Sequence, residues 1–234
     1  ATRALSYSQA SLDGVYNRFG LGLNSADDTS QITQMRISNG GTKVQVCNHL
    51  TIYPITLCPT VANYSVVAGS APGTWQLLDG NGTSGGSFTV SALADAKVYL
   101  AAGRANSSST DALFRIGVTD KSTWQVGLGH GSASTGSWGT VDLKADNTST
   151  RTGIATDGSA VNTANSYFNM VVPDPVTNAA VPGVQGMRQL PGQGGSTYFA
   201  MQGAGLFAIV GANDVAHATN GYLPLSLMDC ADRV

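Results

Sequence analysis

Short runs of β-branched and aromatic residues, separated by clusters of turn-forming residues, constrain the fold of this chain more than any other feature. The runs, such as QITQMRI at 31–37 and AKVYLAA at 96–102, partly alternate between apolar and polar residues. Turn clusters such as SNGGT and LDGNGTSGG punctuate them, so that strands recur about every 8 to 14 residues, as in sandwiches and barrels. We therefore predict a main antiparallel β domain over residues 30–172.

Composition argues against solvent-facing helices. All fourteen acidic residues are aspartates, because the chain contains no glutamate, and only four lysines are present. Glutamate and lysine are good helix formers, whereas Asp, Asn, Ser, Thr and Gly favour caps and turns. The predicted fold class is therefore all-β, as an antiparallel β-sandwich or a jelly-roll-like domain.

The N-terminal segment, residues 1–29, is predicted to be a short helix or an arm. Residues 4–19 are the best helix candidate, although Gly14 weakens it. The apolar residues that would share one helix face are Leu5, Leu12, Val15, Tyr16 and Phe19.

Two further segments follow the main β domain. Residues 173–196 are rich in proline and glycine, which leave little room for regular structure. They predict a long loop, or an arm that reaches a neighbouring subunit. Residues 197–234 begin with the most apolar stretch, TYFAMQGAGLFAIVGA, and are expected to supply closing strands of the same domain.

The weak charge of the chain limits its partners. Only 11% of residues are charged, against about 25% in typical globular proteins, and the net charge is −2. No basic run indicates a nucleic-acid site, and no apolar run approaches the roughly 20 residues of a membrane helix. A surface of small polar groups favours a molecule that lives outside the cell or within a large assembly.

The densest group of reactive side chains is CNHLTIYPITLC at 47–58. A metal site would need close ligand pairs, which Cys47 and His49 lack, and a catalytic Cys–His pair has no further support. A disulfide between Cys47 and Cys58 across a hairpin is as good an interpretation as two buried free thiols. Cys230 is the odd cysteine, expected to be buried or near the C-terminal edge.

No catalytic constellation stands out elsewhere. The stretch GNGTSGG invites comparison with the G-D-S-G-G motif of trypsin-like proteases, but Thr83 stands where the aspartate is needed. No two aspartates form an evident acid–base pair, since those close in sequence lie in turn-like contexts. We therefore expect a protein that is not an enzyme, with no cofactor and no metal.

Without a matching family motif, function is inferred from the surface and the architecture. The first hypothesis is a self-assembling structural protein: a virion component (capsid shell, decoration or tail) or a subunit of an extracellular filament, with itself as partner in a homo-oligomer. It would belong to a virion, the extracellular space or the cell surface. The alternative is a secreted carbohydrate-binding module or adhesin, in which Trp138, in the Gly/Ser-rich GSASTGSWGT, contacts a glycan.

Overall fold

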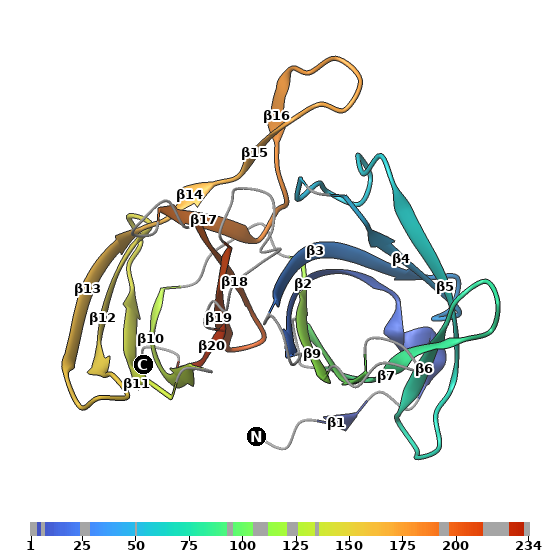
Figure 1. The fold of residues 1–234 in the computed structure, drawn as a ribbon, viewed down its shortest axis with the longest axis horizontal. Helices are drawn as coiled ribbons and strands as arrows, with labels where there is room; N and C mark the ends of the chain where they lie inside the picture. Colours follow the sequence, from blue (N-terminus) through green and yellow to red (C-terminus); the bar gives the residue numbers. More distant parts are fainter. Residues whose placement is uncertain are drawn as a thin grey trace.

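The chain folds into antiparallel sheets. The computed structural model describes residues 4–5, 8–23, 29–49, 51–92, 96–104, 112–120, 126–133, 136–191, 197–212 and 225–231. Within these ranges the regular structure is β apart from one short 3-10 helix, and it comprises two nine-stranded sheets and a two-stranded hairpin (Figure 1). This confirms the all-β prediction. None of the described residues belongs to a helix that could cross a membrane.

The first sheet closes into a barrel. Its strands are β1 (Ala4–Leu5), β2 (Gly14–Leu23), β3 (Thr29–Ser38), β4 (Lys43–Cys47), β5 (Val61–Ala68), β6 (Trp75–Leu78), β7 (Ser84–Ala92), β8 (Lys97–Arg104) and β9 (Ala112–Thr119). From β2 to β9 each strand pairs with the next along the chain, and β9 returns to pair with β2. The expected sandwich or jelly roll is therefore wrong, because consecutive pairing and closure of eight strands make an up-and-down barrel without free edges.

The helix expected over residues 4–19 is also wrong. Among the described residues of this stretch, only η1 (Gln9–Leu12) is helical, and Gly14–Leu23 form β2. Tyr16 faces the barrel interior and Phe19 packs on the outer wall, so both faces of β2 are covered. A strand buried on both faces carries apolar residues on both sides. In this segment the spacing of those apolar residues also fits one face of a helix, which led to the wrong prediction.

The interior of the barrel is filled at one end. Leu12 of η1 is fully buried in the interior cluster, and its carbonyl accepts a hydrogen bond of 2.7 Å from the Tyr16 hydroxyl. Gln9 fastens η1 to the wall by donating through Nε2 to the carbonyl of Val66 at 3.0 Å. Helix η1 is thus a plug in one mouth of the barrel.

The second sheet is formed by the later part of the chain. Its strands are β10 (Gly127–Ala133), β11 (Trp138–Leu143), β12 (Thr148–Ile154), β13 (Ala160–Ser166), β14 (Phe168–Asn169), β17 (Met187–Pro191), β18 (Thr197–Gly203), β19 (Leu206–Ala212) and β20 (Leu225–Ala231). Their order is β13-β12-β11-β10-β20-β19-β18-β17-β14. The chain passes from the first sheet to the second between Thr119 and Gly127, so the boundaries predicted at 30, 172 and 196 do not mark the sheets, and the four-part division stays a prediction.

The proline- and glycine-rich segment contains more regular structure than expected. Strands β15 (Val171–Pro173) and β16 (Ala180–Pro182) pair as a hairpin that projects from the body in Figure 1, and β17 follows. Its turn is fixed by Asp174, whose carboxylate accepts backbone N–H groups of Val176 (2.9 Å) and Thr177 (2.7 Å). We call residues 171–182 the projecting hairpin.

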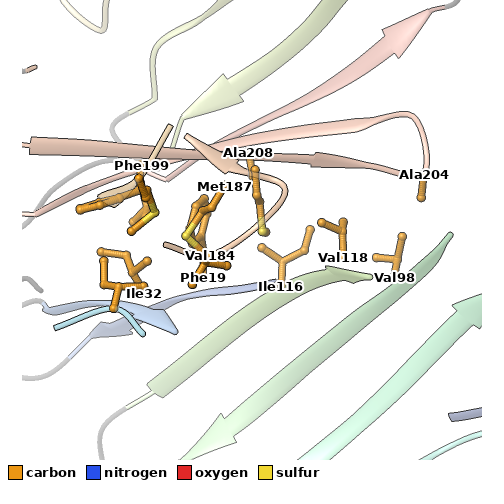
Figure 2. Packing of buried hydrophobic residues seen from close by; sticks show 14 of the residues in the cluster. Phe19, Ile32, Val98, Ile116, Val118, Val184, Met187, Phe199, Ala204 and Ala208 are labelled. Carbon is orange, nitrogen blue, oxygen red and sulfur yellow. The ribbon is translucent and has the colours of Figure 1, made fainter. Parts of the chain in front are cut away.

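The outer wall of the barrel packs against the second sheet. Phe19, Ile116 and Val118 of the barrel meet Phe199 and other side chains of the second sheet in one buried cluster (Figure 2). Burying each such side chain stabilises the fold by about 1.5–3 kcal/mol. A second cluster lies inside the barrel, at the end that η1 closes, and a third lies on one face of the second sheet.

Candidate functional site

The cysteine-rich loop is a structural element. β4 ends at Cys47, and the structure joins this residue to Cys58 in a disulfide with Cα atoms 5.7 Å apart. The loop between them is tied to the barrel because the N–H of Ile55 donates to Oε1 of Gln34 at 2.8 Å. His49 accepts the N–H of Thr51 through Nδ1 at 3.0 Å. A disulfide sulfur is not a thiolate, so no Cys–His nucleophile is formed here.

The described residues offer no cluster of three His, Cys, Asp or Glu side chains that could hold a metal ion. Several aspartates instead cap turns. Asp146 accepts the hydroxyl (2.6 Å) and the N–H (3.0 Å) of Thr148, and these hydrogen bonds hold its pKa below the usual value. Asp157 binds Ser159 in the same way. His217 lies outside the described residues; Cys230 is in β20, but its side chain lies outside them too.

Trp138 lies on an open sheet surface. It begins β11, is 58% exposed and pairs across the sheet with Ser132 of β10 and Ile154 of β12. Next to it runs a polar row in which the Thr140 and Thr152 hydroxyls hydrogen bond at 2.8 Å. This β10–β13 outer face comprises Leu128, His130, Ser132, Trp138, Thr140, Asp142, Thr150, Thr152, Ile154, Ala160, Asn162 and Ala164.

A pair of glycines sets the spacing beneath Trp138. Gly139 and Gly153 face each other on β11 and β12. A Cβ at Gly139 would lie 2.2 Å from the carbonyl oxygen of Thr152 and 2.7 Å from Cα of Gly153, a spacing only glycine permits. The two strands therefore approach closely and hold the Trp138 and Ile154 side chains next to each other on the opposite face.

The projecting hairpin exposes apolar side chains. Val176 at its turn is 90% exposed, Val171 on β15 is 65% exposed, and Phe168 at its base is 56% exposed. Elsewhere, the outer wall over β7, β8 and β9 has a shallow apolar groove with a volume of about 280 Å³. The residues lining this β7–β9 groove are Thr74, Ser87, Phe88, Thr89, Leu100, Ala101, Ala102 and Phe114.

Sequence reasoning missed two arginines inside the barrel. Arg18 of β2 is 7% exposed, and Arg115 of β9 is partly buried. Both stand on the interior face of their strands, since Tyr16 is an interior residue and Ile116 packs outside. The available signal was the alternation in GVYNRFGLGL, where Arg18 shares the face of Tyr16 and three glycines.

Comparisons with known proteins add little. No model of a known protein family matches the chain, and no curated protein does. Among solved structures, a similar one is the crystal structure of a protein of unknown function from the DUF3598 family of Nostoc punctiforme. The two chains are 11% identical with a TM-score of 0.30, over 97% of this chain and 99% of that one. A likeness at this level supports no argument about function.

Proposed function

We propose that this chain is a non-catalytic structural protein that assembles with copies of itself, as a virion component or as a subunit of an extracellular filament. The projecting hairpin carries the proposal. The base of the hairpin packs on its own chain through Val172, but its turn is uncovered. Val176 at this turn is 90% exposed. Its complete burial against a partner would stabilise the complex by about 1.5–3 kcal/mol.

The β7–β9 groove is the acceptor that fits this hairpin. It is lined by apolar and small hydroxyl side chains and by no charged residue, and Leu100 and Phe114 are its exposed apolar members. Insertion of Val176 would therefore bury no unpaired charge.

A hairpin cannot occupy the groove of its own chain. Val172 of β15 packs with Cys47 of β4 in one buried cluster, so the hairpin rises beside β4. The groove is centred on β8, which is four strands from β4 in either direction around the closed barrel. The contact is therefore between molecules and heterologous, and such contacts build rings or open filaments.

Location follows from the same features. The Cys47–Cys58 disulfide supports an oxidising compartment or a virion. The low content of charged residues, 11%, supports a surface that is largely covered by neighbouring subunits.

The experiment is light scattering with negative-stain microscopy on the native protein and two variants. We expect many-subunit particles or filaments from the native protein. Val176→Asp removes the hairpin contact and Leu100→Asp removes the groove contact, so each alone should be monomeric. Because each retains the half that the other lacks, an equimolar mixture should form one-to-one dimers and nothing larger.

The control is Val126→Asp, which charges a valine that is 48% exposed and belongs to neither surface. It should assemble like the native protein. A native protein that stays monomeric at every concentration contradicts assembly, and assembly that both variants retain contradicts the hairpin and groove as its contacts.

Glycan binding is the second candidate, because the Trp138 indole is 58% exposed beside hydroxyl and amide side chains on a sheet surface. Aromatic faces supply apolar contact area, and the polar row supplies hydrogen bonds. Screening glycans by tryptophan fluorescence should then give a shift that Trp138→Ala abolishes and Val126→Ala leaves unchanged. A screen without any such glycan contradicts this candidate and leaves assembly untouched.

A further inference from the structure

Two arginines face each other diagonally inside the barrel. On the interior face, Arg18 of β2 lies opposite Gly117 of β9, and Arg115 of β9 lies opposite Gly20 of β2. A Cβ built at Gly117 would be 3.7 Å from Cβ of Arg18, and one built at Gly20 would be 3.2 Å from Cγ of Arg115. The two cationic side chains therefore leave adjacent strands with a glycine beside each.

Tyr99 of β8 completes the group. It lies opposite Gly117, and its Cβ is 3.4 Å from the position of a Cβ at that glycine. Tyr99 is 1% exposed and Arg18 is 7% exposed. The Tyr99 hydroxyl and Nε of Arg18 are both buried without a hydrogen bond of good geometry. The hydroxyl is nevertheless close enough to the guanidinium to interact with it electrostatically.

Within the described ranges, no carboxylate balances the charge of Arg18. Among the described residues, the groups that act electrostatically on Arg18 are Arg115, Tyr99 and Tyr64, none of them an acid. Arg115 donates through Nε to the neutral amide oxygen of Gln31 at 3.4 Å. Buried cations in proteins are almost always paired with an anion, because removal of an unpaired charge from water is costly.

Beyond the arginines, glycines alternate with a larger residue on the interior face, since Gly22 and Gly103 flank Leu113, which is 8% exposed. η1 closes the end near Tyr16, and along β2 from there the interior positions are Arg18, Gly20 and Gly22. A Cβ added at Gly103, on β8, would meet only Cα of Gly86, at 3.7 Å. Arg115 stands one register step farther from the plug than Arg18 and is partly exposed, so solvent reaches Arg115 from that side.

We propose that Arg18, Arg115 and Tyr99 form a binding site inside the barrel for an oxyanion, the carboxylate or phosphate group of a small ligand. Two guanidinium groups offer paired N–H donors that match the oxygens of such a group, and the Tyr99 hydroxyl offers another donor. An anion would give the unpaired Arg18 Nε an acceptor and would separate two cations that otherwise repel each other. The site is independent of the assembly surfaces, which lie outside the barrel.

The test is isothermal titration of the native protein with inorganic phosphate and with straight-chain monocarboxylates from acetate to octanoate, in a buffer without other oxyanions. Arg115→Met should weaken binding about tenfold or more, as expected for loss of a charge-assisted hydrogen bond, and Tyr99→Phe should weaken it less. Arg36→Met is the matched control, because Arg36 lies on the outer face of β3 between the interior residues Met35 and Ile37.

A second measurement needs no variant. In protein labelled with ¹⁵N in arginine, the Nε–H signals of Arg18 and Arg115 should shift with the titrated anion while that of Arg36 stays in place. Affinity that rises with carboxylate chain length identifies an amphipathic carboxylate, and stronger binding of phosphate identifies a phosphate group; both support the site. No binding of either anion to the native protein at millimolar concentration, or equal binding by Arg115→Met, overturns it.

Discussion

Replacement of Arg18 by methionine tests whether the buried charge of Arg18 stabilises or destabilises the fold. Burial, then the charge of Arg115, lowers the pKa of Arg18 from its ordinary value in water to about 10. At 1.36 kcal/mol for each pKa unit, the buried charge is disfavoured by about 3 kcal/mol. Methionine retains most of the apolar stem without the charge. We therefore expect Arg18→Met to raise the free energy of unfolding by about 1–3 kcal/mol in a buffer without oxyanions.

Urea denaturation at pH 7, followed by circular dichroism, measures this difference. Arg36→Met should change stability by no more than about 0.5 kcal/mol, as usual for surface substitutions. The stability difference between the two proteins also depends on pH. The free-energy cost of the buried Arg18 charge is present below the folded pKa of about 10 and diminishes as pH rises above it. The advantage of Arg18→Met should therefore shrink from pH 9 to pH 11. A variant that is destabilised by 1 kcal/mol or more at pH 7 would refute the reasoning, because Arg18 would then have partners that it needs.

Three further predictions concern other parts of the fold. Desolvation raises the pKa of Asp120 to about 6, so the free energy of unfolding should fall as pH rises from about 4 to about 6. The expected fall is about 1 kcal/mol, because the carboxyl group is half exposed. Asp120→Asn should abolish this pH dependence in urea melts, and an unchanged dependence would contradict the assignment. Non-reducing peptide mapping after alkylation should find Cys47 and Cys58 linked, and their double replacement by alanine should cost about 2–4 kcal/mol; labelling of both thiols contradicts the pair. Gly139→Ala should cost about 1–3 kcal/mol, since its Cβ would lie 2.2 Å from a carbonyl oxygen; a loss below 0.5 kcal/mol means that β11 and β12 can separate.

Strand content could be predicted from the sequence where strands are apolar, but strand partners could not. QITQMRI falls within β3 and AKVYLAA, apart from Ala96, within β8, whereas TSTRTGI of β12 and AVNTANS of β13 have the polar composition of turns. Periodicity reports which faces are buried, and it does not report which strand lies beside which. Closure of the barrel depends on pairing between β2 and β9, which no local pattern encodes.

Of the candidate sites, one could be predicted from the sequence and one could not. Exposure of Trp138 could be expected from its Gly/Ser-rich surroundings, because such segments rarely bury a large ring. The group formed by Arg18, Tyr99 and Arg115 could not, because its members are distant in sequence and meet only when the barrel closes. A charged residue within an apolar alternating run is the local signal that a search for such sites should follow.

Closure of the barrel also determines how it folds and opens. Neighbouring strands from β2 to β9 are joined by local connections, but the seam pairs Tyr16 with Thr119, roughly a hundred residues apart, and contacts of such separation carry the largest loop-closure entropy. We expect the seam to form last and to open first. Arg18 and Arg115 lie on the two strands of that seam, so an anion bound between them would link β2 to β9. Such an anion would slow unfolding more than it speeds folding.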